Sequence, residues 1–188
     1  RAPVCVNLTL TEVRLNSNLR YRAKLCKEAG DCDDEMPTLD VTFLEDFSKA
    51  FQGDKTFNAD ITLWNTYSAK SMKSMFQGAH KFDQEIGFWA TTNVENMDHM
   101  FRDARHFNQR IDTWDTSKVK SMVGMFQGAT LFDQDLSPWD LSSLEDSSYM
   151  FRNTKHFNGR LPNMPVLQSV KGMFKGAVKF DRDISHLT

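Results

Sequence analysis

The chain has 188 residues with 23 basic and 25 acidic side chains, so its net charge is −2 and no global positive field would attract nucleic acid or an anionic membrane. Aromatic residues make up 12% of the sequence, far more than disordered chains carry. No apolar run approaches the roughly 20 residues that cross a bilayer. The composition predicts a soluble, packed protein with no nucleic-acid partner and no membrane insertion.

Residues 1–40 do not fit the repeat that follows them, and we expect them to form an N-terminal capping segment. Val4, Val6 and Leu8 alternate with polar residues, which predicts a strand, and residues 19–29 have the composition of a helix. A stack of repeats exposes an apolar face at its end, and an atypical terminal segment usually covers that face.

The same segment contains the three cysteines of the chain, Cys5, Cys26 and Cys32, and a glycosylation sequon at Asn7. An odd number of cysteines cannot all pair within one chain, so a disulfide among them leaves one thiol over. Cysteines clustered beside a sequon favour an oxidising compartment. We therefore expect an exported, lumenal or cell-surface protein.

A repeat of about 25 residues occupies residues 41–188. Its anchor phenylalanines are separated by 25, 25, 25, 25 and 23 residues and are Phe51, Phe76, Phe101, Phe126, Phe151 and Phe174. Counted from this anchor as position 0, a second Phe follows at +6 and an Ile or Leu at +10. A tryptophan column at +13 consists of Trp64, Trp89, Trp114 and Trp139. Such a period predicts six stacked coils whose Phe and Trp columns form a ladder in the core.

Within each coil, the apolar residues at −7, −4 and −1 have the spacing of one helical face, as in Val94, Met97 and Met100. Ser or Thr at −9 with Glu at −6 resembles a capping box in three coils, and Gly, Asn or Asp at +2 is typical of a left-handed helix stop. We therefore predict helices near 43–52, 68–77, 93–102, 118–127, 143–152 and 166–175.

The segment after each helix, Phe-[Asn/Asp]-x-x-[Ile/Leu], is too short for a second helix. It has two apolar positions with polar residues between them, which predicts a short strand paired in parallel with its equivalents. The fold class predicted is therefore α/β, a leucine-rich-repeat-like solenoid of about six coils with an N-terminal cap.

Polar positions support the stacking, because their charges alternate from coil to coil. Position +7 alternates Asn and Asp, position −6 alternates Glu and Lys, and position +9 places Arg110 and Arg160 between carboxylates. Opposite charges on adjacent strands are favourable and like charges are not. Alternation of this kind is expected only if successive coils touch.

The motif Met-Phe-x-Gly-Ala-x-x-Phe-[Asn/Asp]-Gln-x-[Ile/Leu]-x-x-Trp, present in residues 75–89 and 125–139, resembles the BspA-like surface-protein repeat, which is related to leucine-rich repeats and abundant in mycoplasma surface lipoproteins. The resemblance covers about residues 41–188. It implies a surface protein with adhesion or protein-binding roles and no catalytic residues. The chain departs from the pattern at Met164, which replaces the next Trp, and at Pro162 and Pro165.

The sequence offers no recognisable catalytic or metal chemistry. It has no nucleophile elbow, phosphate loop or HExxH motif, so we expect a non-enzymatic protein without a cofactor. His106 and His156 occupy equivalent positions two coils apart, about 10 Å by strand spacing, too far to share one ion. The acidic stretch at residues 31–35 lacks EF-hand spacing and is expected to be a solvated loop.

One surface stands out, because basic residues recur at +1, +4 and +5. Stacking would gather them into a basic ridge of Lys55, His80, Lys81, Arg102, Arg105, His106, Arg152, Lys155, His156 and Lys179. Charged coil corners are also ordinary solvated surface. The leading hypothesis is a protein-protein interaction scaffold, either a surface or adhesion module or an accessory subunit of an assembly that covers the C-terminal coil. The alternative is a receptor that binds glycans or other anionic ligands through the basic ridge.

Overall fold

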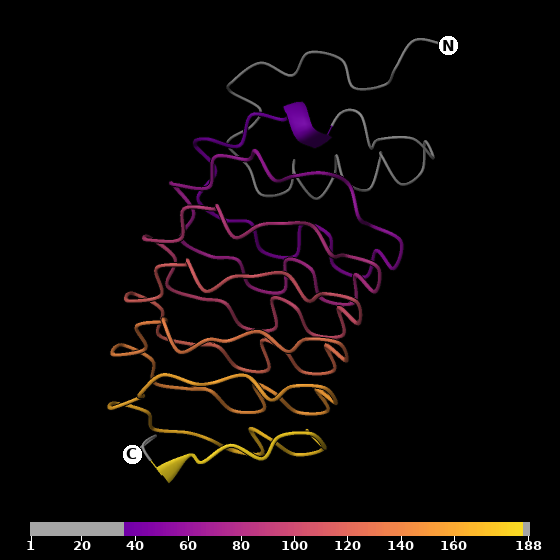
Figure 1. Ribbon diagram of the computed structural model, residues 1–188. Coiled ribbons are helices and arrows are strands. Elements are labelled where there is room, and N and C mark those ends of the chain that lie inside the picture. Colours follow the sequence, from indigo (N-terminus) through magenta and orange to yellow (C-terminus); the bar gives the residue numbers. More distant parts are fainter. Residues whose placement is uncertain (1–35, 186–188) are drawn as a thin grey trace.

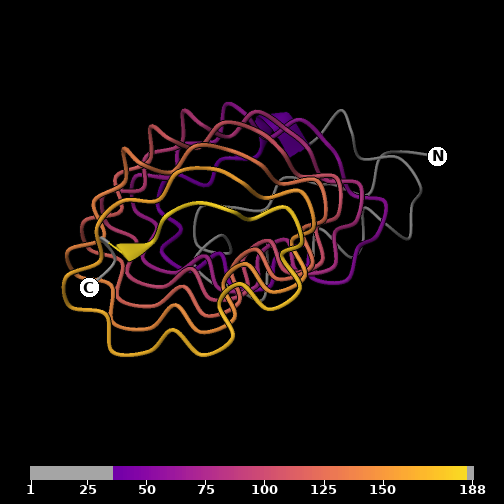
Figure 2. The same ribbon diagram turned by 60° about the horizontal axis from the view of Figure 1, so that its bottom comes forward.

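The computed structural model describes residues 36–185, which form a stack of six coils that we number by their anchor Phe (Figure 1). Viewed at an angle from one end, successive coils lie over one another with closely similar paths (Figure 2). Among the described residues, the one named helical element is the 3-10 helix η1 (Met36–Thr38), which precedes coil 1. Parallel contacts between coils are isolated bridges at position −5, such as Asp46 with Ser71 and Ser71 with Asn96.

The predicted α/β solenoid is wrong in its secondary structure, because none of the six predicted helices forms. The segments near 43–52, 68–77, 93–102, 118–127, 143–152 and 166–175 are runs of turns. Every second amide in these segments donates to a carbonyl of the next coil and not to the helical acceptor four residues back. In coil 2 the amides of Met72, Ser74, Phe76 and Gly78 donate to carbonyl oxygens of coil 3 over 2.7–3.0 Å. This register binds each coil to its neighbour at every second residue.

Each run of turns contains two residues in the left-handed conformation. The expected one at +2 is present in all six coils, with φ between 58° and 78°, and the second lies at −2, as in Ser74 (φ 57°). Both are third residues of turns: the amide of Met75 donates to the carbonyl of Met72, and that of Ala79 to Phe76. A positive φ at the third residue is the signature of a type II turn. The residues at +2 therefore close turns and cap no helix.

Contacts between coils at position −2 explain why two coils carry a glycine there. The His99 ring lies over Gly124, where a Cβ would approach its Nδ1 atom to 2.6 Å, and the Tyr149 ring lies over Gly172 in the same way, at 2.9 Å. Large side chains and glycines alternate at this position from coil 3 to coil 6, because a bulky residue in one coil covers the backbone of the next.

The predicted parallel strands are also absent from the segments after the second Phe. A ladder of side chains joins these segments instead. The amide of Asp83 donates to Oδ1 of Asn58 (2.8 Å), that of Asn108 to Asp83 (2.9 Å) and that of Asp133 to Asn108 (2.9 Å). The side-chain oxygen at +7 thus replaces the backbone acceptor of a β-ladder. Alternating Asn with Asp keeps two carboxylates from stacking directly on each other.

The core consists of the aromatic columns. The anchor rings of successive coils stack with centroids 5.6–5.7 Å apart, and each also stacks on the second Phe of its own coil at 3.7–4.0 Å. The anchors from Phe51 to Phe151 are buried, whereas Phe174 in coil 6 is half-buried. Because the anchor rings of coils 2–5 are covered by coils on both sides, the core is continuous along the stack.

The tryptophan column is hydrogen-bonded as well as buried. Each indole Nε1 donates to the +10 carbonyl of the preceding coil, as Trp114 does to Ile86 at 3.0 Å. Trp64 makes the same bond to Met36 (2.7 Å), so the contacts of the repeat begin before residue 41. Met164 fills the next slot with 1% of its surface exposed. Beyond the shortened connection, the bond from Phe151 to Met173 (2.9 Å) continues the stacking into coil 6.

Candidate binding surface

Turns at positions +4 and +5 arrange the residues predicted for the basic ridge. The amide of Lys81 donates to the carbonyl of Lys55 (3.3 Å), and that of His106 to His80 (3.2 Å). The same bonds continue through Leu131 to His156. The neutral pair Thr130 and Leu131 in coil 4 divides the basic residues into two groups: Lys55, His80, Lys81, Arg105 and His106 on coils 1–3, and Lys155, His156 and Lys179 on coils 5 and 6.

The first group shares a positive electrostatic environment. Burial lowers the pKa of His80, and the charges of Arg105 and Lys55 lower it further, whereas Asp103 opposes them. The ring Nδ1 of His106 lies 2.7 Å from the carbonyl oxygen of His80 and donates to it in the matching tautomer. A column with several cations and exposed donors can bind an anion, because no single carboxylate neutralises it.

The structure gives the two arginines at +1 other partners. The Nε atom of Arg102 lies 3.6 Å from a carboxylate oxygen of Asp103, and the guanidinium of Arg152 lies 5.5 Å from the ring centroid of Tyr149. Both arginines are half-buried. They belong to the turn that precedes the ridge, and their charges are partly engaged there.

Ion pairs between coils follow the expected alternation at −6. Lys70 pairs with Glu45 at 2.9 Å and Lys120 with Glu95 at 3.0 Å, all with side chains more than half exposed. At +9 Arg160 pairs with Asp135 of the preceding coil at 3.8 Å, whereas Arg110 pairs with Asp112 of its own coil at 2.9 Å. Asp112 is two residues away in extended chain and therefore projects from the same side. Exposed pairs of this kind contribute only about 0–1 kcal/mol each.

Sequence reasoning missed a buried polar network in coil 3. Asp98, 8% exposed, accepts hydrogen bonds from the Ser121 hydroxyl (2.5 Å), the Val123 amide (2.9 Å) and the Asn96 side chain (3.2 Å). The Lys73 ammonium lies 3.5 Å away. The sequence signal for this network is the polar residues that recur at −3 and −5. In other coils, the serine at −3 bonds to the serine at −5 of the next coil, as Ser48 does to Ser71 and Ser148 to Ser169.

His99 lies beside this network. Burial is the main cause of the lowered pKa of its imidazole, and the Arg102 charge adds to the effect while Asp98 opposes it. A lowered pKa means that the folded chain takes up a proton on His99 less readily than the unfolded chain does. Below the ordinary value of 6.5, the unfolded state is therefore favoured by protonation.

We expect the free energy of unfolding to decrease as the pH falls from 7 to 5, and the variant His99→Asn to show a shallower decrease. Asn tolerates the left-handed backbone at this position (φ 56°) and does not titrate. Urea unfolding at several pH values measures the slope. Lys49→Asn, at the equivalent left-handed position of coil 1, is the control and should keep the wild-type slope. Identical slopes in wild type and His99→Asn would show that His99 does not contribute.

Among residues 36–185, no three His, Cys, Asp or Glu side chains gather in a way that could hold a metal ion. The same part of the chain has no helix long and apolar enough to cross a membrane. Cys5, Cys26, Cys32 and Asn7, predicted for a disulfide and for glycosylation, lie outside the described residues.

Two overlapping stretches, residues 22–112 and 84–187, match one family, described as a Mycoplasma protein of unknown function, DUF285. Together they span nearly the whole chain. The chain belongs to the DUF285 family. The prediction that this DUF285 chain is a repeat protein is confirmed, because one family matches two stretches of it. No curated protein and no solved structure matches it.

Proposed function

We propose that this DUF285 chain is a non-enzymatic protein-protein interaction scaffold, either a surface or adhesion module or an accessory subunit of a larger assembly. The observation that carries the proposal is the stacking register: backbone bonds from coil to coil hold equivalent residues of successive coils side by side, and their anchor rings stack 5.6–5.7 Å apart. Repeat stacks use such extended arrays of side chains to bind partners.

A BspA-like character and an exported or cell-surface location belong to the same proposal. The Met-Phe-x-Gly-Ala motif and the match to a family described from Mycoplasma support them. The resemblance of the repeat to that of mycoplasma surface lipoproteins also supports this character and location.

A partner that covers coil 6 is part of the proposal as well. Val170 and Ile184, whose equivalents in the other coils are buried, are 56% and 42% exposed there. A hollow of about 330 Å³ lies beside Ile184 and is also lined by Arg160, Phe180 and Arg182. An apolar end surface of this kind is usually covered in repeat proteins.

Cross-linking in the native source, followed by mass spectrometry, tests the scaffold. Cross-links from surface lysines of the stack to one defined partner, at stoichiometric yield, are the expected result. A chain that is recovered only as free monomer under gentle extraction and cross-linking would remove the proposal. The cross-linked lysines would also identify which face of the stack is occupied.

The second candidate is a receptor for anionic ligands, favoured by the shared positive environment of Lys55, His80 and Arg105. We expect wild type to bind heparin. The variant in which Arg105, His106, Lys155 and His156 are all changed to Glu should lose at least about tenfold in affinity, because binding of a polyanion is driven by the release of its counterions. Salt-dependent elution from immobilised heparin measures it. The control reverses Lys70 and Lys120, which are ion-paired at −6. Equal retention of wild type and the ridge variant would remove this candidate.

A further inference from the structure

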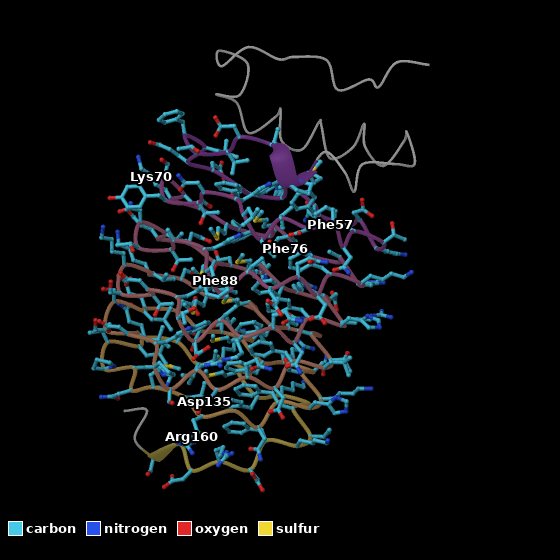
Figure 3. The ribbon with its side chains drawn as sticks, turned by 45° about the horizontal axis from the view of Figure 1, so that its top comes forward. Phe57, Lys70, Phe76, Phe88, Asp135 and Arg160 are labelled. Atoms are coloured by element: carbon cyan, nitrogen blue, oxygen red, sulfur yellow. The ribbon has the colours of Figure 1, made fainter. Side chains whose placement is uncertain are left out.

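Four large apolar side chains project from coils 1 and 2. Phe43 is 74% exposed, Leu63 85% and Tyr67 64%. Phe88, which is labelled in Figure 3, is 89% exposed. We call these four residues the apolar patch. Large apolar side chains that gather on a surface typically mark an interaction site, whereas single ones need no explanation.

The stacking register places the four residues on adjacent coils. Leu63 and Phe88 immediately precede Trp64 and Trp89, whose rings stack at 6.3 Å, so they are neighbours on adjacent coils. Leu63 and Tyr67 are exposed residues of two successive turns, four residues apart, with the buried Trp64 and Thr66 between them.

Phe43 completes the patch. It lies three residues before Asp46, and Tyr67 lies four residues before Ser71, the bridge partner of Asp46. The two rings are therefore on adjacent coils in nearly the same register. The patch consists of two pairs on adjacent coils, Leu63 with Phe88 and Phe43 with Tyr67.

The repeat itself shows that the fold does not need apolar residues at these positions. Coils 3–5 have the same path and the same core, yet their equivalent residues are polar or small. At the position of Leu63 and Phe88 these coils carry Thr113, Pro138 and Asn163. At the position of Tyr67 they carry Thr92, Ser117 and Ser142, and at that of Phe43 they carry Asn93, Lys118 and Ser143. The stack therefore does not require the apolar side chains of coils 1 and 2.

The rim of the patch is acidic. Asp60 and Glu85 lie three residues before Leu63 and Phe88 and are exposed. Hydrogen bonds from Thr62 hold the pKa of Asp60 below its usual value, so its carboxylate stays charged. Arg110, the next residue in this column, turns away from Glu85 to pair with Asp112. The nearby cation Lys70 is paired with Glu45.

We propose that the apolar patch docks a cationic amphipathic segment of a protein partner. Apolar side chains on one face of the segment pack between the two pairs of the patch, and its Lys or Arg side chains reach Asp60 and Glu85. An amphipathic helix laid on an apolar surface is a recurrent mode of peptide recognition. This inference rests on the proposed scaffold function and names the class of partner and the surface that receives it.

A designed peptide of about 18 residues, or five helical turns, tests the docking. Its leucines form one face and its lysines the other. Fluorescence anisotropy with the labelled peptide at about 0.15 M salt measures binding, a salt concentration at which only close charges contribute strongly. A peptide of the same composition with its leucines scattered around the helix, and a leucine-glutamate peptide, are the controls. Wild type should bind the first peptide at least tenfold more tightly than either control.

Matched variants locate the binding. Leu63→Thr with Phe88→Thr introduces the residue that coil 3 carries at this position, and should weaken binding about tenfold or more. Asp60→Asn with Glu85→Gln should weaken it less at high salt than at low salt, because charges are screened. Leu131→Thr removes an exposed Leu outside the patch, introduces the residue of coil 1 and should leave binding unchanged. Unchanged thermal unfolding of all variants shows that the fold is intact.

Several results would overturn the inference. One is equal affinity for the amphipathic and scattered peptides, and another is unchanged binding by the double Thr variant. A third is a concentration-dependent dimer that the double Thr variant abolishes, which would assign the patch to a second copy. Vesicle binding lost in that variant while peptide binding persists would assign it to a lipid surface. Native cross-links retained by the variant would leave the scaffold intact and remove only this docking site.

Discussion

Replacing Phe101 by alanine is expected to lower the free energy of unfolding by about 3–5 kcal/mol. Its side chain is fully buried, and its ring stacks on Phe76 (5.6 Å), Phe126 (5.7 Å) and Phe107 (3.9 Å). The variant leaves a cavity with coils on both sides, which the hydrogen-bonded register prevents from closing. Urea unfolding followed by tryptophan fluorescence measures the loss, since Trp114 lies 6.2 Å from the Phe101 ring.

Phe174→Ala is the matched control at the end of the column. Phe174 is half-buried and stacks on Phe151 of one neighbouring coil and on Phe180 of its own coil. Because it lacks a described coil on its other side, we expect its loss to cost clearly less, about half as much as that of Phe101. Equal costs for the two variants would contradict a column in which burial comes from both neighbours.

The period and its columns could be predicted from the sequence, because equivalent residues recur at one spacing. The intervals between anchor phenylalanines gave the register that the ring stacking follows. Alternating charges at −6 predicted the pairs Lys70–Glu45 and Lys120–Glu95. Each of these inferences needs only that neighbouring coils touch and is independent of the backbone conformation within a coil.

The helices were predicted wrongly because two different backbones satisfy the same apolar spacing. Residues at −7, −4 and −1 point inward in a helix and also in the observed run of turns. The distinguishing feature is the left-handed residue at −2, which a helix cannot contain. Four coils carry Lys49, Ser74, His99 or Tyr149 there, residue types that hide the requirement, and Gly124 and Gly172 alone reveal it.

The binding surfaces were predictable to different degrees. The basic ridge follows from columns at +4 and +5, but the engagement of Arg102 with Asp103 and of Arg152 with Tyr149 depends on turn geometry that the sequence does not display. The apolar patch depends on which residues point outward. A helix through residues 43–52 places Phe43 differently from the observed turns, so the wrong secondary structure concealed the patch.

The Asp98 network shows how a single coil departs from the pattern of its neighbours. At −3, Ser48 and Ser148 each bond through their hydroxyl to a serine of the next coil, at 2.9 and 2.7 Å. Asp98 replaces that hydroxyl by a carboxylate, which accepts from Ser121 and also from the Val123 amide. The carboxylate thus joins coils 3 and 4 by two bonds where a serine makes one between side chains.

Replacing Asp98 by alanine is therefore expected to lower the free energy of unfolding by about 2–4 kcal/mol, because hydrogen bonds to a charged acceptor are lost and two partly buried donors are left without it. Asp98→Ser restores the hydroxyl pair that other coils form and should cost distinctly less than Asp98→Ala. Urea unfolding of both variants gives the comparison. If both cost the same, the Ser121 hydroxyl would contribute nothing through this bond, and packing at −3 would account for the loss. A serine variant close to wild type would mean that the hydroxyl pair alone suffices to join these two coils.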